Sequence, residues 1–143
     1  QMEGTETTNP FLAFDEIYQA MDKPKLLVVD FHAETTSEKV AMGLYLDGRV
    51  SAVLGSHTHV PTADAHILPK QTGYISDLGM VGGQNTVLGV KADIIINRFK
   101  GENIGPFDWP ETGLADVSAV YLELDTATGH CLQIEPLHAT ITV

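Results

Sequence analysis

Two short apolar segments, each followed by histidine, limit the folds open to this chain more than any other feature. The first segment covers residues 26–31 and precedes His32, and the second covers residues 50–54 and precedes His57 and His59. Each segment has the length of a buried strand and is too short for a typical helix. We therefore expect two strands whose carboxyl ends carry the histidines.

The residues between the two segments have the pattern of a helix. Thr35 and Glu38 fit the S/T-x-x-E capping box, and we expect the helix to cover residues 36–46. A strand-helix-strand crossover is almost always right-handed and returns the second strand parallel to the first. The sequence thus predicts a parallel β-α-β unit with its histidines at one sheet edge, where open α/β sheets bind ligands.

The spacing of the histidines favours a metal site. In extended backbone, residues i and i+2 point to the same side, so His57 and His59 would face the same crevice. Imidazole suits iron, manganese, zinc, copper and nickel. A polar strand end without metal is the simpler alternative, and three histidines fit either a mononuclear site or part of a larger one.

The remaining chain predicts one α/β domain that ends in a β-hairpin. Asn9 and Pro10 open an expected helix over residues 11–21, since proline suits the first helical position. Further expected elements are short strands at 67–70 and 73–77, a short helix at 91–99, and a hairpin whose strands run from 117 to 124 and, after a turn at 126–129, to 137.

Composition excludes some classes of partner. Eight basic residues stand against 19 acidic ones, for a net charge of −11, which argues against binding long nucleic acid in a basic groove. A small phosphodiester is still allowed, because bound cations can dominate the local field. We find no apolar run of the roughly 20 residues that a membrane span needs. The single cysteine, Cys131, excludes an internal disulfide and is expected to be a buried structural thiol.

Other polar residues receive supporting roles. Asp30 precedes His32 on the same expected strand and could orient it as a carboxylate behind the ligand, or could simply end the strand. Glu34 could act in the same way, and Asp77 is expected to support a loop rather than to take part in catalysis. We expect His66, His130 and His138 to be surface or structural residues.

Three motifs carry a resemblance to a known family. They are V-D-F-H-A-E-T-T-S-E-K at 29–39, G-S-H-T-H-V at 55–60, and I-L-P-K-Q-T-G-Y-I-S-D-L-G-M at 67–80. In this order they resemble the YmdB-like metallophosphoesterases of the calcineurin-like superfamily, which are associated with cleavage of 2',3'-cyclic nucleotides. The first motif is specific, whereas G-S-H-T-H alone would fit the wider superfamily.

The resemblance implies a calcineurin-like α/β sandwich that binds two divalent metal ions, which would be Fe, Mn or Zn. His32 and His57 would bind one ion, and His59 the other. Family members also have a first half that supplies an early Asp, a bridging carboxylate, an Asn ligand and the catalytic His of a Gly-Asn-His motif. Neither Gly-Asp nor Gly-Asn occurs in this chain.

We therefore expect residues 1–143 to form a single domain that is the C-terminal half of a larger metallophosphoesterase domain. No catalytic residue is assigned in this chain, because the general acid would lie in the other half, and no substrate-binding residue is assigned. The chain would need its N-terminal half or a second chain to complete the site, and a homo-oligomer is one way to provide that second chain. A cytoplasmic location is expected.

The function predicted for the full-length protein is metal-dependent hydrolysis of a small phosphodiester, a 2',3'-cyclic nucleotide. The alternatives are a non-catalytic α/β fragment that binds metal or a partner, and another metallohydrolase that shares the H-x-H motif. A measurement of metal content distinguishes the predicted function from the first alternative. A comparison of activity on cyclic and linear phosphodiesters distinguishes it from the second.

Overall fold

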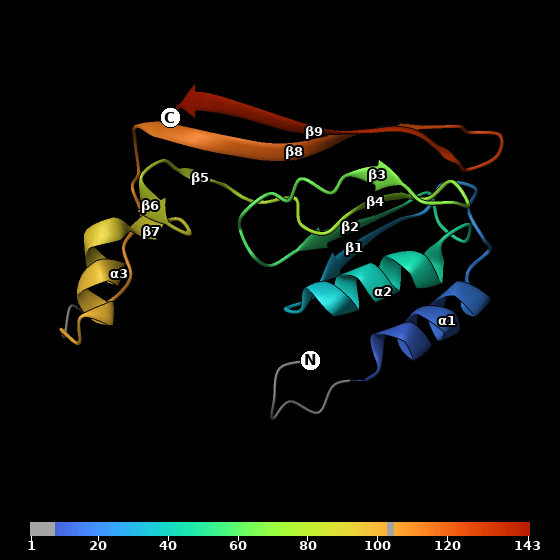
Figure 1. Ribbon diagram of the computed structural model, residues 1–143, viewed down its shortest axis with the longest axis horizontal. Helices are drawn as coiled ribbons and strands as arrows, with labels where there is room; N and C mark the ends of the chain where they lie inside the picture. Colours follow the sequence, from blue (N-terminus) through green and yellow to red (C-terminus); the bar gives the residue numbers. More distant parts are fainter. Residues whose placement is uncertain (1–7, 103–104) are drawn as a thin grey trace.

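The chain forms three layers, with two helices on one face of a sheet and a long hairpin on the other (Figure 1). The computed structural model describes residues 8–102 and 105–143. The sheet has the order β1-β2-β4-β3, and β3 is its antiparallel strand. The elements of the first two layers are α1 (Pro10–Ala20), β1 (Val28–His32), α2 (Thr36–Leu46), β2 (Ala52–Ser56), β3 (His66–Ile67) and β4 (Gly73–Ile75).

The predicted β-α-β unit is confirmed. β1 and β2 are parallel, with α2 between them in sequence, and the register pairs Val28 with Ala52 and His32 with Ser56. Both strands lie further along the chain than predicted. For β2 the reason is a turn in which the Arg49 N–H donates to the Leu46 carbonyl, which delays the start of the strand. His32 is therefore the last residue of its strand rather than the first residue after it.

The helices begin where the capping residues predict. The Asn9 side chain accepts from the N–H groups of Phe11 and Leu12, and Pro10 is the first residue of α1. The Thr35 hydroxyl oxygen accepts from the Glu38 N–H at 3.3 Å. These contacts satisfy N–H groups that have no partner within the helix.

The core lies between α2 and the sheet. Gly43 of α2 lies against the Tyr74 ring so closely that a Cβ there would be 2.4 Å from a ring carbon. Partly buried side chains of α1 and β1 complete this core, whose fully buried members are Met42, Leu46, Val50, Val53, Leu68 and Tyr74.

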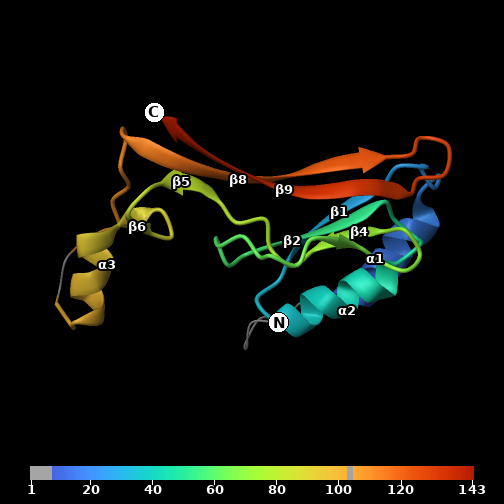
Figure 2. The ribbon, with the colours of Figure 1, turned by 45° about the horizontal axis from the view of Figure 1, so that its top comes forward.

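The second half of the chain extends the molecule in one direction. The hairpin of β8 (Leu114–Leu124) and β9 (Cys131–Thr142) runs the length of the protein, and β5 (Val81–Gly83) pairs with β8 (Figure 2). The predicted hairpin is confirmed, and it is longer than expected. At the far end lie β6 (Thr86–Val87), β7 (Val90–Lys91) and α3 (Ala92–Phe99).

Where the hairpin crosses the sheet, β9 contacts β3 and β4. Cys131 is fully buried there, as predicted, with its sulfur against Gly73. Burial raises the pKa of the Cys131 thiol. The sulfur therefore acts as a packing group.

None of the helices within residues 8–102 and 105–143 is both long enough and apolar enough to cross a membrane.

Gly55 provides a test of how tightly β2 is packed. A Cβ on Gly55 would lie 1.8 Å from the Ser76 carbonyl oxygen, so the backbone would have to move. Gly55→Ala should lower the free energy of unfolding by about 1–3 kcal/mol or more, measured by denaturant unfolding. Gly82→Ala is the matched control, because its Cβ would meet only the flexible Met80 side chain. Equal stability of the two variants would contradict this packing.

Candidate metal centre

His32 and His57 meet at the carboxyl ends of β1 and β2. The Nε2 atom of His32 lies 3.2 Å from the Nδ1 atom of His57. The two rings are 5.0 Å apart and nearly perpendicular, at 78°. Parallel pairing of the two strands brings these side chains together, as the sequence predicted.

A chain of hydrogen bonds orients the His32 ring. The Ser56 hydroxyl donates to Asp30 Oδ1 at 3.2 Å, and Ser56 Oγ also lies 3.1 Å from His32 Nδ1. Because the single hydroxyl proton points to Asp30, Nδ1 of His32 must be the donor in the second contact. The unprotonated Nε2 of His32 then faces His57 and accepts a hydrogen bond from its Nδ1–H at 3.2 Å.

Asp30 thus takes the orienting role predicted for it, but acts through Ser56, which the sequence reasoning missed. The parallel register places Ser56 directly beside His32. Glu34, the other candidate for this role, is exposed, and no hydrogen bond between described residues joins it to the histidine pair.

The separation of the two nitrogens fits ligands of one ion. Imidazole nitrogens that bind an ion at about 2.0–2.1 Å, with an angle of about 90–109° between them, lie roughly 2.8–3.4 Å apart. The observed 3.2 Å is within that interval. An unprotonated Nε2 and a proton held on the opposite nitrogen are also typical of metal-binding histidines.

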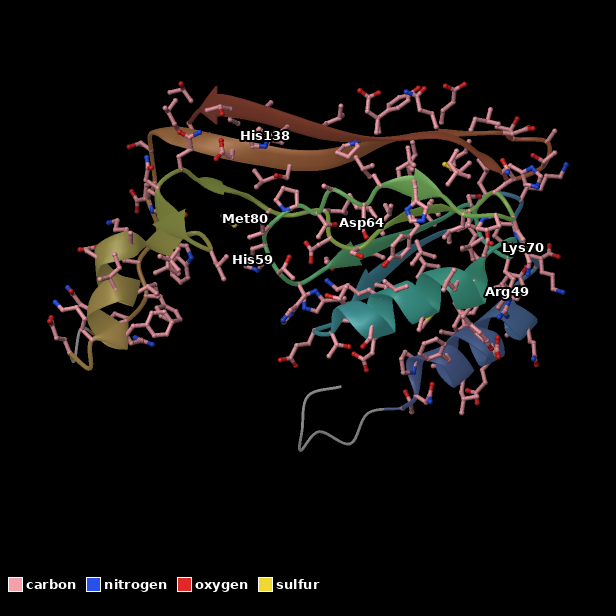
Figure 3. All side chains as sticks on the ribbon, viewed as in Figure 1. Arg49, His59, Asp64, Lys70, Met80 and His138 are labelled. Carbon is pink, nitrogen blue, oxygen red and sulfur yellow. The ribbon has the colours of Figure 1, made fainter. Side chains whose placement is uncertain are left out.

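His59 lies apart from this pair. The expectation of an extended H-x-H segment is wrong, because φ is 127° at His57 and 63° at His59. Positive φ turns the chain at both residues, so alternation of side chains no longer applies. His59 instead lies beside Met80, on the side that faces β6, β7 and α3 (Figure 3). Among the described residues, no three His, Cys, Asp or Glu side chains converge on one metal position.

A buried ion pair holds the loop that follows β2 and carries His57 and His59, which we call the histidine loop. Lys39 Nζ of α2 lies 2.8 Å from Asp77 Oδ2, and both side chains are almost completely buried. The same carboxylate accepts from the backbone N–H of Thr58, between the two histidines, and from that of Gly79. Asp77 therefore supports a loop, as predicted, whereas its partner Lys39 was not anticipated.

The charge state of Asp77 follows from these contacts. Burial alone would raise the pKa of Asp77, but the hydrogen bonds from Lys39, Thr58 and Gly79 outweigh it and hold the pKa below its ordinary value. Asp77 is therefore a carboxylate that stabilises the buried ammonium group of Lys39.

Asp64 supports the segment between the histidine loop and β3 in a similar way. It accepts hydrogen bonds from Thr62 and from the backbone and hydroxyl of Ser76. Burial acts to raise the pKa of Asp64, but these hydrogen bonds lower it overall. The other three histidines are exposed, as predicted: His66, His130 and His138.

Comparison with known proteins identifies the family of this chain. A family model described as YmdB-like protein matches residues 1–137. The 2',3'-cyclic-nucleotide 2'-phosphodiesterase of Bacillus subtilis is 47% identical over 128 residues, which are 89% of this chain and 48% of that protein.

Two solved structures are similar to this chain. A hypothetical protein from Thermus thermophilus superposes with a TM-score of 0.86 at 39% identity, over 95% of this chain and 53% of that one. A phosphatase from Mycoplasma pneumoniae gives 0.86 at 38% identity, over 96% and 48%. The chain spans about half the length of each of these three proteins.

Asp77 should be needed for stability. Asp77→Asn leaves the Lys39 ammonium buried without its counter-charge, and loss of one partner of a buried ion pair costs about 3–5 kcal/mol. Denaturant unfolding at neutral pH should show this loss. Asp108→Asn is the control, because it removes an exposed ion pair with Lys91 and should leave stability nearly unchanged.

The loss of stability caused by Asp77→Asn should depend on pH. Because folding lowers the pKa of Asp77, its stabilisation is complete above the unfolded value of about 3.9 and is lost as pH falls through the folded value. The difference in stability between wild type and Asp77→Asn should therefore shrink below about pH 4. A difference that stays constant down to pH 2 would contradict this account.

Ser56→Ala should weaken metal binding, because it removes the group between Asp30 and His32. Loss of such an orienting contact typically costs about 10–100-fold in metal affinity, which calorimetric titration with Zn²⁺ or Mn²⁺ would measure. Thr140→Ala is the control, since the Thr140 hydroxyl donates to Asp116 of the terminal hairpin. Equal affinities of the two variants would show that Ser56 does not position His32.

Proposed function

This chain belongs to the family of YmdB-like proteins, and we propose that it forms the metal-binding C-terminal half of a phosphodiesterase that hydrolyses 2',3'-cyclic nucleotides. The observation that carries the proposal is the His32–His57 pair, with nitrogens 3.2 Å apart at the carboxyl ends of two parallel strands. The name of the Bacillus subtilis relative, a 2',3'-cyclic-nucleotide 2'-phosphodiesterase, supports the substrate class.

We assign His32 and His57 to one divalent ion and His59 to a second, with Fe, Mn or Zn as the candidate metals. Bound divalent ions would supply Lewis-acid stabilisation of the phosphate charge and a lowered pKa for the attacking water. The residues of this chain hold and orient the ligands. Asp30 and Ser56 keep the proton on His32 Nδ1, and Asp77 fixes the backbone between His57 and His59.

The remaining parts of the reaction are assigned to a half that this chain lacks. Two ions need more ligands than three imidazoles provide, and the chain spans 48% of the Bacillus subtilis relative. We propose that the other half completes a calcineurin-like α/β sandwich and supplies the bridging carboxylate, the Asn ligand and the proton-donating His.

The exposed edge of the sheet supports this assignment. β1 is an edge strand whose only neighbour within the described sheet is β2. Apolar side chains are exposed near it, including Leu26 at 41% and Val28 at 43%. Open strand edges and exposed apolar side chains are features that a further segment can cover.

His57→Ala in the full-length protein should reduce hydrolysis of 2',3'-cyclic AMP at least about 100-fold, because loss of a metal ligand removes several kcal/mol of transition-state stabilisation. Assays with Mn²⁺ or Fe²⁺ would measure this. His66→Ala is the control, since His66 is an exposed histidine on β3 and should leave turnover unchanged.

Two further outcomes would separate the alternatives. Faster turnover of a linear diester such as bis(4-nitrophenyl) phosphate would favour a different metallohydrolase. Turnover of 2',3'-cyclic AMP by residues 1–143 alone, at a rate sensitive to His57→Ala, would contradict the assignment of this chain as half of an active site.

A further inference from the structure

A pocket of about 280 Å³ lies next to His59, on the side away from the His32–His57 pair. Its walls come from segments that are distant in sequence, namely the histidine loop, β5, the β6–β7 turn and the loop before β8. Among the residues that line it are His59, Met80, Gly82, Leu88 and Trp109.

The lining favours an uncharged planar group. Among the described residues that line the pocket, His59 has the one ionisable side chain and Trp109 the one large aromatic ring. Trp109 is 56% exposed as a residue, and its ring lines the pocket. Gly89, without a side chain, leaves the pyrrole edge of the indole open, since a Cβ there would lie 3.7 Å from Trp109 Cδ1.

The loop that carries Trp109 is anchored to β7 and to α3. The Lys91 N–H donates to the Asp108 carbonyl at 2.9 Å. Phe107 contacts Trp109 edge-on, and the Arg98 guanidinium of α3 lies 4.4 Å from the Phe107 ring centre. These contacts limit the loss of conformational freedom that an occupant of the pocket would cause.

The size of the pocket fits one heterocycle. Drug-sized ligands occupy pockets of about 300–1,000 Å³, so a volume of about 280 Å³ suits a smaller group. A pocket of this size with an aromatic wall, beside a candidate phosphate site, matches a nucleotide, in which an uncharged planar base is joined through the sugar to a charged phosphate.

We propose that this pocket binds the nucleobase of the substrate, with the base stacked on the Trp109 indole and the phosphate on the histidine side. The inference rests on the proposed phosphodiesterase function and adds to it the residue that recognises the base. Stacking on an indole accepts every base, so the site should accept all four nucleotides, with purines bound moderately better than pyrimidines.

The test compares two substrates that share the reacting phosphate. In the full-length protein, Trp109→Ala should raise KM for 2',3'-cyclic AMP about tenfold or more, since loss of a base–aromatic stack has an effect of that size. KM for ribose 2',3'-cyclic phosphate, which has no base, should stay within about twofold of wild type. Trp109→Phe should restore most of the lost affinity.

Two further variants keep the test specific. Phe99→Ala is the matched control, because Phe99 is an aromatic residue that is 86% exposed on α3 and does not line the pocket. It should leave both KM values unchanged. Gly82→Val fills the pocket from a strand position where a Cβ meets only Met80, and it should act as Trp109→Ala does, even if the latter fails to fold.

The outcomes separate this inference from the proposed function. Equal effects of Trp109→Ala on both substrates, or no effect on either, would overturn the base site while the phosphodiesterase assignment stands. If the wild type hydrolyses neither substrate, the proposed function fails. Calorimetric binding of adenosine 3'-monophosphate then still decides the pocket, since its affinity must fall in Trp109→Ala and not in Phe99→Ala.

Discussion

The arrangement of the candidate site depends on the buried ion pair between Lys39 and Asp77. A buried ammonium or carboxylate is costly without a partner, so each residue requires the other. The Asp77 carboxylate also accepts the N–H of Thr58, and this bond fixes the backbone between His57 and His59. Positive φ at these histidines costs on the order of 1–3 kcal/mol per residue, and the Asp77 contact is one of the interactions that offset this cost.

The two ends of the site are built differently. At the sheet, Asp30, Ser56 and His32 form a hydrogen-bonded row that leaves one imidazole lone pair directed at His57. Toward α3, His59 borders a pocket with an aromatic wall. The first end suits a cation and the phosphate that it binds, whereas the second suits an uncharged ring. The net charge of −11 still allows a small anionic substrate, because the proposed metal ions would dominate the field at the site.

Much of the fold was predictable from local patterns. The alternation of apolar segments with a capped helix predicted β1, α2 and β2, and the handedness of the crossover predicted that His32 and His57 would meet. The terminal hairpin followed from its alternating side chains. Strand boundaries were predicted less accurately. The start of β2 depends on the turn at Arg49, which forms only because α2 ends at Leu46.

The missed features depend on contacts that sequence spacing does not reveal. Lys39 and Asp77 are 38 residues apart, and neither stands in a pattern that predicts a buried charge. Ser56 orients His32 only because the strands pair in one particular register. The extended form assumed for H-T-H failed because β2 ends at Ser56, so the histidines follow loop geometry. Local sequence patterns give Trp109 no role, since its place beside His59 depends on the path of the whole second half of the chain.

The central claim is that His32 Nε2 and His57 Nδ1 bind the same ion. Nitrogen-15 NMR of histidine-labelled full-length protein, titrated with Zn²⁺, tests it most directly. Without metal, His32 should show the Nδ1–H form that its contact with Ser56 requires. With metal, the resonances of His32 Nε2 and His57 Nδ1 should shift together and to the same extent of saturation, while those of the exposed His66, His130 and His138 stay in place. Shifts confined to the exposed histidines, or binding at His32 through Nδ1, would contradict the account.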